Sequence, residues 1–312
     1  MIQGATKSGM KPILANSVQG FVSEPDPVLA EGALLANLKL IEGVVATYPD
    51  DVELLNMAAM ARATYAFGFL LDELEAVIYA RPNDRAAAQA LIGRAKASYA
   101  ASRRYAERSL ADHDEWVRAV ANRELEAMSK PDFTGALSTL EPEQAEALFW
   151  LAFSWGGSIQ VQLDPSEATQ LPKIEAAIAR ARELDPHLFY DIGVEMMAGV
   201  VAGFRSPALG GNPKLATEHF TKAKQQSGLL FPDVLLAQLV YAQNEQQNEF
   251  ETTLRRVLAS PGRPDRALLD VLAKRKACRL LANIDDLFLT APQAAPEECQ
   301  AITHKYPLES AP

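Results

Sequence analysis

Residues 171–186 read LPKIEAAIARARELDP, and this stretch shows how the chain is built. Apolar residues recur at Ile174, Ile178 and Ala181, which is the three- and four-residue spacing of one face of an α-helix. Charged residues occupy positions between them, and the final Asp and Pro are typical of the end of one helix and the start of the next. The stretch therefore predicts an amphipathic helix whose small Ala181 lets a neighbouring helix come close.

The same spacing continues over most of the chain. Segments rich in apolar residues are separated by Pro, Gly, Asn and Asp, and the Val/Ile/Thr alternation that is typical of β-strands is missing. We therefore expect an all-α protein. The predicted helical segments are 28–47, 51–80, 84–111, 114–128, 141–162, 167–184, 188–203, 213–227, 231–246, 248–259 and 265–289.

Three of these segments share a frame in which a large residue follows an apolar one by four positions and an alanine comes three later. Such an alanine occurs in the second helix of a tetratricopeptide unit, but the spacing of the frames here is loose and longer than the regular repeat of about 34 residues. We expect a degenerate array of helix hairpins; chance alanine spacing in an alanine-rich chain is the alternative. The frames are Ala88–Ile92–Ala95, Ile174–Ile178–Ala181 and Ala216–Phe220–Ala223.

The short turns between the helical segments predict one domain over residues 27–289. Residues 206–220 illustrate it, because two adjacent glycines suit a tight turn, Asn212 suits a helix N-cap and Pro213 suits the first helical position. No stretch has the composition of a linker between domains. We expect a partly irregular N-terminal segment at 1–26 and a Pro-rich tail over the surface at 290–312.

Composition excludes several classes of function. The chain has 312 residues, 48% of them hydrophobic, and a formal net charge of -10, so its overall field repels nucleic acid and anionic membranes. No run approaches the roughly 18 apolar residues of a membrane-spanning helix. The N-terminus lacks the apolar stretch of a secretion signal. We therefore expect either a cytoplasmic protein or an exported chain without its leader.

The chain has two cysteines, in different settings. Cys278 lies in an amphipathic helical pattern, and Cys299 lies in the Pro-rich tail. The simpler interpretation is two free thiols, one half-buried and the other exposed. A disulfide that joins the tail to the last helix is the alternative in an oxidising compartment.

No catalytic or metal-binding motif is present. The sequence lacks GxSxG, HExxH, CxxC and a GxGxxG that follows a strand. None of the four histidines has another at ligand spacing, and His219 beside Phe220 is typical of a satisfied core histidine. Asp285 and Asp286 are adjacent and so point to different sides of a helix. We expect no enzyme, no metal site and no cofactor.

Aromatic residues gather at residues 147–159, ALFWLAFSWGGSI, which hold two of the three tryptophans. Trp155 lies about 140° round a helix from Trp150, so this helix is apolar on nearly every side. Such a helix is either central in the array or beside an internal cavity. The candidate binding residues here are Phe149, Trp150, Phe153, Ser154 and Trp155.

Two other segments combine methionines, aromatics and small residues, namely 57–71, MAAMARATYAFGFLL, and 194–204, VEMMAGVVAGF. Flexible methionines and rigid aromatics beside Ala and Gly can line an apolar ligand tunnel. Core packing explains any single one of them, but the same mixture in three helices favours a tunnel. The further candidates are Tyr65, Phe69, Met196, Met197 and Phe204.

At these segments the sequence resembles the TatT family, the T component of some TRAP-type periplasmic uptake systems. The most specific matching motifs are the Trp-containing ALFWLAFSWGGSIQV at 147–161, SPALGGNPKLATEHFTKAK at 206–224 and AKRKACRLLANIDDLF at 273–288. The resemblance covers roughly 27–289. It implies a tetratricopeptide-like all-helical fold with a pore or cavity in each protomer, trimers in some members, and no catalytic residues.

The resemblance also implies a periplasmic protein, usually lipid-anchored, beside a solute-binding protein. We therefore predict a non-enzymatic transport accessory that binds a sterol-like or fatty-acid-like solute and passes it to or from that partner. Ser154 or Ser158 would orient a lone polar group of the solute. The alternative is a tetratricopeptide-type scaffold for protein–protein interaction, in which the aromatic cluster is only core.

Overall fold

The computed structural model describes residues 17–162, 167–189 and 193–289, together with Pro296, Glu297, Cys299 and Ile302. All regular structure in these residues is helical, and they contain no strand. The prediction of an all-α protein is therefore confirmed. Of the predicted terminal segments, residues 17–23 are helical, while residues 1–16 and most of the tail lie outside the described residues.

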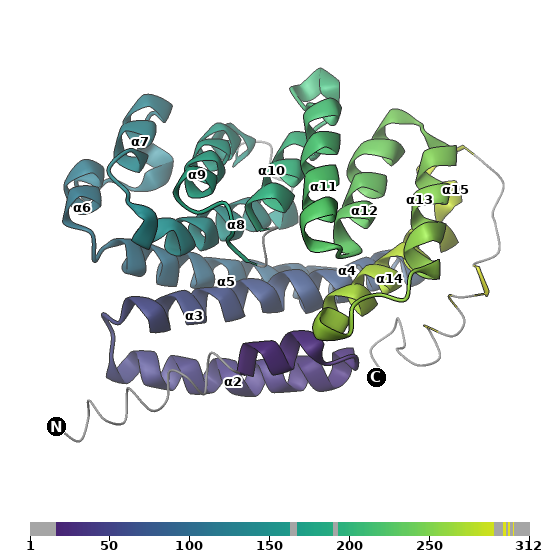
Figure 1. Ribbon diagram of the computed structural model, residues 1–312, viewed down its shortest axis with the longest axis horizontal. Coiled ribbons are helices and arrows are strands. Elements are labelled where there is room, and N and C mark those ends of the chain that lie inside the picture. Colours follow the sequence, from purple (N-terminus) through teal and green to yellow (C-terminus); the bar gives the residue numbers. More distant parts are fainter. Residues whose placement is uncertain are drawn as a thin grey trace.

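The first part of the chain forms a layer of long helices that lie side by side (Figure 1). The helix that begins at Val52 continues to Ala80 through one π-helical turn. It is long and apolar enough to cross a membrane, yet 72% of its most apolar window is buried inside the fold. The elements are α2 (Pro27–Thr47), α3 (Val52–Tyr65), the π turn η1 (Ala66–Leu70), α4 (Leu71–Ala80) and α5 (Arg85–Leu110).

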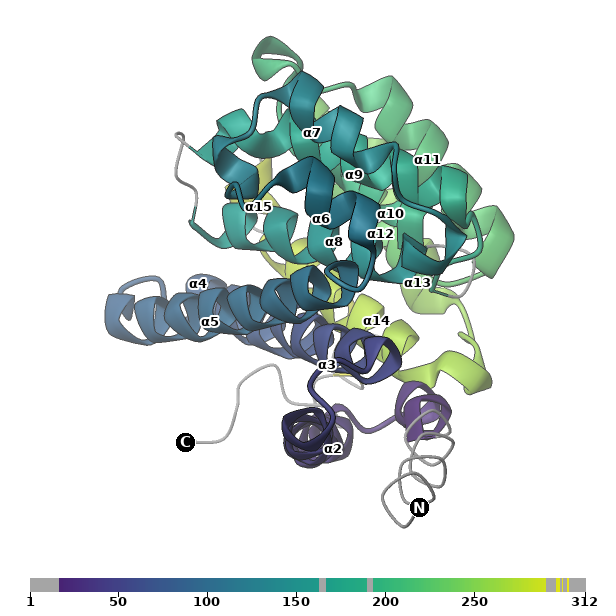
Figure 2. The ribbon, with the colours of Figure 1, turned by 90° about the vertical axis from the view of Figure 1, so that its left-hand side faces the viewer.

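The remaining helices pack above this layer, and α14 lies between the two groups (Figure 2). They are α6 (Asp114–Val120), α7 (Lys130–Leu137), α8 (Ala145–Gln162), α9 (Leu171–Leu184), α10 (Gly193–Gly203), α11 (Pro213–Ser227), α12 (Phe231–Leu236), the π turn η6 (Ala237–Tyr241), α13 (Gln247–Ala259), α14 (Ala267–Ala282) and α15 (Ile284–Leu287). Short 3-10 turns are η2 (Leu125–Ala127), η3 (Pro142–Gln144), η4 (Glu167–Gln170), η5 (Pro207–Leu209), η7 (Ala242–Asn244) and η8 (Pro264–Arg266).

Local sequence signals explain several helix starts, because a side chain caps the N-terminus of α2, α3, α5, α7 and α11. The Asn212 side chain accepts a hydrogen bond from the Leu215 N–H at 3.0 Å, as predicted for an N-cap. The predicted single helix 114–128 is wrong, because Ala121 and Asn122 adopt left-handed backbone conformations with φ of 50° and 58°. The same prediction missed α7, whose eight residues are too few for a clear periodic pattern.

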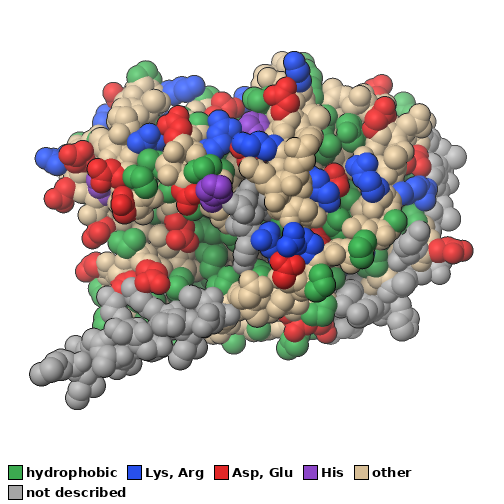
Figure 3. Space-filling view, in the orientation of Figure 1, with side chains coloured by type: hydrophobic (Ala, Val, Ile, Leu, Met, Phe, Trp, Pro, Cys, Tyr) green, Lys and Arg blue, Asp and Glu red, His purple; other side chains and the backbone are tan. Residues whose placement is uncertain are grey.

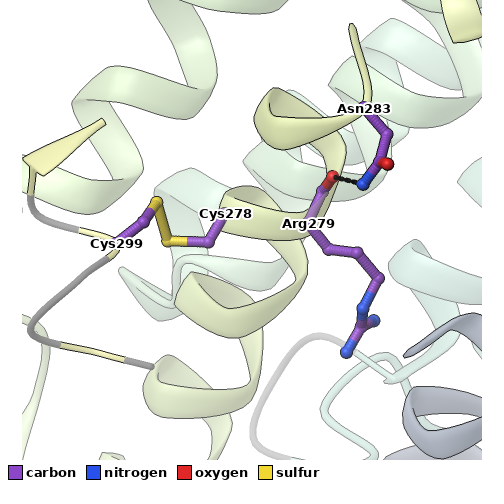
Figure 4. The surroundings of a disulfide bond; sticks show 4 residues. All are labelled: Cys278, Arg279, Asn283 and Cys299. Carbon is purple, nitrogen blue, oxygen red and sulfur yellow. Dashed lines mark hydrogen bonds between the residues drawn. A yellow bond between two sulfur atoms is a disulfide. The ribbon is translucent and has the colours of Figure 1, made fainter. Parts of the chain in front are cut away.

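The two cysteines form a disulfide between α14 and the tail, with 5.5 Å between their Cα atoms (Figure 4). Both residues are buried, Cys278 at 1% and Cys299 at 3% exposure. The interpretation as free thiols with Cys299 exposed is therefore wrong. The reason is tertiary, because Cys299 packs into the same core cluster as Cys278.

Small residues in the predicted frames allow close helix packing. Ala216 and Ala223 of α11 are fully buried. A Cβ on Gly199 of α10 would lie only 2.7 Å from a ring carbon of Phe220, so glycine is needed at this position for α10 to approach α11. The helix pair α10 and α11 is therefore in intimate contact. In the first frame Ala95 is fully buried, whereas Ala88 is half-buried. A tetratricopeptide-like repeat of these pairs stays a prediction.

Candidate functional site

An apolar pocket of about 90 Å³ lies where α4, α8, α10, η6 and α14 meet. Its lining residues recur three or four positions apart on each helix, so each helix presents one stripe to it. On α8 the stripe is Phe153, Gly156, Gly157 and Gln160; on α10 it is Met197, Val200 and Val201, followed by Phe204 directly after the helix. The lining also includes Phe67, Gly68, Leu71, Asp72 and Glu75 before and within α4, and Leu272 and Lys276 of α14.

Three phenylalanines from different helices form one wall of the pocket. The ring centroid of Phe67 lies 5.7 Å from that of Phe153 and 5.4 Å from that of Phe231. These distances are those of favourable aromatic contacts. The cluster ties η1, α8 and α12 together on the apolar side of the pocket.

Both π-helical turns of the described chain border this pocket. Phe67 and Gly68 come from η1, while Gln238 and Leu239 come from η6. A π turn inserts one extra residue into a helix and often occurs at functional sites. Both π turns of the described chain therefore lie at the same pocket.

Two helical glycines leave room that side chains would fill. A Cβ on Gly156 would lie 3.7 Å from Ile174 Cγ2 and from Met197 Cε, and one on Gly68 would lie 3.6 Å from Leu272 Cδ1. These are ordinary van der Waals distances, so packing does not require glycine at either position. Glycine in a helix costs about 0.5–1 kcal/mol relative to alanine. Its presence at both positions therefore keeps the pocket open at a cost in stability.

Gly157, by contrast, is required by packing. A Cβ at this position would lie 2.5 to 2.9 Å from the ring atoms of Tyr99. The Tyr99 ring thus lies flat against the backbone of α8 and closes one side of the pocket. Burial raises the pKa of the Tyr99 hydroxyl, which stays protonated at neutral pH.

A charged cluster lies at the α4 and α14 side of the pocket. The Glu75 carboxylate accepts hydrogen bonds from Lys276 and Arg279, and Arg279 also donates to Asp72 at 2.8 Å. Burial by itself raises the pKa of the Glu75 carboxyl, but the adjacent Lys276 and Arg279 outweigh burial and hold it below its usual value. Glu75 is therefore ionised, and one edge of an otherwise apolar pocket is charged.

Three of the ten predicted binding residues line this pocket, namely Phe153, Met197 and Phe204. Two others, Ser154 and Trp155, border a separate and more polar pocket on the other side of Tyr99. The Ser154 hydroxyl is hydrogen-bonded to the Ser102 hydroxyl at 2.6 Å. Ser154, which the sequence suggested would orient a polar group of the solute, therefore does not line the apolar pocket.

The two tryptophans of the aromatic stretch are each packed within the fold. Trp155 lies edge-on to Phe133, with the guanidinium of Arg103 4.5 Å from its ring centroid. The Trp150 indole N–H donates to the Glu146 carboxylate at 3.3 Å. Burial raises the pKa of Glu146, although this hydrogen bond opposes the shift.

The remaining predicted residues are in the core. Phe149 packs against Trp150, and Phe69 contacts Phe21 with ring centroids 6.4 Å apart. The Tyr65 hydroxyl accepts a hydrogen bond from Arg94. Met196 is buried in the core beside α11, one residue away from the pocket-lining Met197.

Sequence reasoning missed the glycines and the polar residues of the pocket. The signal for Gly156 and Gln160 was present, because both follow Phe153 at helical spacing. Lys276 had no such signal, since its position depends on how α14 packs against α4. The aromatic content of residues 147–159 drew attention to the right helix but did not distinguish its faces.

No group of three metal-ligating side chains occurs among the residues that the structure describes. His219 Nδ1 lies 2.7 Å from Glu195 Oε2, so this histidine is paired within the core. Acidic and basic side chains are interspersed over the face shown in Figure 3. The pocket between α4, α8, α10 and α14 combines an apolar lining with one charged edge.

The sequence was compared with models of known families. The sequence model of the family described as the TRAP transporter T-component matches residues 23–288, most of the chain and all helices from α2 to α15. No curated protein matches the sequence.

Proposed function

This chain belongs to the TRAP transporter T-component family, and from that premise we propose that it binds an apolar solute in the pocket between α4, α8, α10 and α14. The family makes the chain an accessory component of a TRAP transporter. The observation that carries the proposal is the pair of helical glycines, Gly68 and Gly156, which keep the pocket open where alanine would fit.

The pocket suits a slender apolar solute, such as a fatty-acid-like chain or the edge of a sterol-like ring system. About 90 Å³ exceeds the space that one water needs several times over. A longer solute requires the flexible Met197 and the half-buried Phe204 to move aside. Each apolar square ångström removed from water contributes about 25 cal/mol before the costs of binding.

The solute would pass to or from another component of the transporter, and a periplasmic solute-binding protein is the partner we propose. TRAP transporter components of this family are expected in the periplasm. The Cys278–Cys299 disulfide supports that setting, because disulfides persist in oxidising compartments. A lipid anchor and a trimeric assembly are part of the same proposal.

The proposal is tested by titrating the purified protein with N-phenyl-1-naphthylamine, an apolar dye whose fluorescence rises on burial. We expect saturable binding to the unmodified chain and none to Gly156→Leu, because leucine would fill the pocket. The control is Gly93→Leu, since Gly93 lies on α5 and a Cβ added there would meet open space. That variant should bind the dye as the unmodified chain does.

The proposal is wrong if the dye does not bind, or if Gly156→Leu binds it unchanged. Mass spectrometry of solvent extracts from the purified protein gives independent evidence, since a carried solute would appear there. If both measurements are negative, the tetratricopeptide-type interaction scaffold becomes the better function for this chain.

A further inference from the structure

The pocket has an apolar end and a polar end. Helix α5 runs antiparallel to α3, because Ser98 bonds the carbonyl of Arg62 while Ser102 bonds that of Ala59. It also runs antiparallel to α8, since Ser102 contacts Ser154 while Tyr99 lies on Gly157. Helices α8 and α3, with its continuation α4, therefore run in the same direction.

Because α8 and α4 run in the same direction, their pocket-lining residues can be matched level by level. Phe67 and Phe153 contact each other at one level, and two helical turns further along, the lining residues are Glu75 and Gln160. Gln160 is exposed, which identifies this end as the mouth of the pocket.

Two other helices bring polar groups to the same end. Leu272 of α14 lies over Gly68, and one turn later Lys276 bonds Glu75. Helix α10 runs in the same direction as α8, because a Cβ on Gly193 would lie 3.0 Å from Phe149 Cζ and one on Gly156 would lie 3.7 Å from Met197 Cε. A Cβ on Gly203 at the end of α10 would lie 3.4 Å from the Cβ of Leu239, which follows Gln238 in η6. The mouth is therefore lined by Lys276 and two glutamines.

These polar groups retain hydrogen-bonding capacity. A lysine ammonium has three N–H donors, and in the described part of the chain Lys276 uses one, for Glu75. The side-chain amides of Gln160 and Gln238 make no hydrogen bond with any residue that the structure describes. The nearby carboxylates are already engaged, Glu75 by Lys276 and Asp72 by Arg275 and Arg279.

We propose that the solute is an amphipath with a carboxylate head, held at the mouth by Lys276 with help from Gln160 and Gln238. Its apolar part lies against the three phenylalanines. The inference rests on the proposed function, because it names the class of solute for the same pocket. An ammonium-to-carboxylate hydrogen bond is short and strong, whereas a cationic head would meet Lys276 and the two arginines without a free acceptor.

The first test varies the head group on one apolar chain. Dodecanoate, methyl dodecanoate and dodecyltrimethylammonium are titrated calorimetrically into the unmodified protein at neutral pH, each at concentrations where it is dissolved as a monomer. We expect dodecanoate to bind at least about tenfold more tightly than the ester, and the ammonium compound to bind most weakly.

The outcomes separate the two proposals. If the ester or the ammonium compound binds as tightly as dodecanoate, the carboxylate head is wrong while the proposed apolar pocket stands. If none of the three binds, the proposed function fails and the head-group inference fails with it.

The second test removes the anchor. Lys276→Met should weaken dodecanoate binding about tenfold and leave the ester unchanged. Lys274→Met is the control, because Lys274 lies on the same helix and bonds the Ser260 carbonyl outside the pocket. It should change neither affinity. Unaltered dodecanoate binding by Lys276→Met would overturn the assignment, and ester binding reports that the variant is folded.

Discussion

At the scale of single residues, Gly156 and Gly157 are neighbours in α8 with opposite requirements. A methyl group on Gly156 would enter the pocket at ordinary contact distance, whereas one on Gly157 would overlap the Tyr99 ring. The sequence shows both glycines, and their adjacency resembles a turn signal. Their roles depend on which side of α8 faces Tyr99, and that is a property of the packed helices.

We predict that alanine at these two positions changes stability in opposite directions. Gly156→Ala should raise the free energy of unfolding by up to about 1 kcal/mol, because alanine favours a helix. Gly157→Ala should lower it by about 1–3 kcal/mol through overpacking against Tyr99. Urea titration of both variants measures the difference. Shifts of the same sign would show that the Tyr99 contact is not as described.

At the scale of elements, a buried carboxylate joins α10 to α11. Glu195 is 2% exposed and bonds His219 and Lys222. Burial by itself raises the pKa of the Glu195 carboxyl, but these two partners lower it below its usual value. A carboxyl whose pKa is lower in the folded than in the unfolded state stabilises the fold above its unfolded pKa. That contribution is lost as pH falls through the folded pKa.

We therefore predict that Glu195→Gln lowers the free energy of unfolding at neutral pH, and that the deficit shrinks as pH falls below 4.5. Urea titrations at neutral pH and in this acid range measure it. Glu218→Gln, at an exposed position on the same helix pair, is the control and should have little effect. A deficit for Glu195→Gln that is independent of pH would contradict the expected ionisation.

Helix boundaries were the feature that the sequence predicted best. Long segments such as α5 and α11 were predicted to within a residue or two, because their periodicity and caps are local. The π turns η1 and η6 were not predicted, since one inserted residue hardly disturbs the pattern. Left-handed Ala121 was missed because alanine rarely adopts that conformation.

At the scale of the whole molecule, the disulfide ties the tail to the helix that carries Lys276 and Arg279. Figure 4 shows that Cys278 faces Cys299 while the neighbouring Arg279 side chain extends away from the disulfide. The loop it closes spans 21 residues. Helix α14 therefore carries both the disulfide that holds the tail and Lys276 at the polar mouth of the pocket.

We predict that reduction of this disulfide lowers the free energy of unfolding by about 3 kcal/mol, because the unfolded chain regains the entropy of that loop. The melting temperature is compared with and without reductant. The double variant Cys278→Ala with Cys299→Ala should melt like the reduced chain and ignore the reductant. A melting temperature of the unmodified protein that reductant leaves unchanged would exclude a stabilising bond.

The sequence by itself determined the all-helical class, most helix boundaries and the family, because periodicity, caps and motifs are properties of neighbouring residues. Only the tertiary structure decided that Phe153 lines the pocket while Trp150 and Trp155 pack elsewhere, and that Cys278 pairs with Cys299. A helix that is apolar on every side has no preferred face of its own. The helices packed around it determine which face is buried against protein and which face borders a cavity.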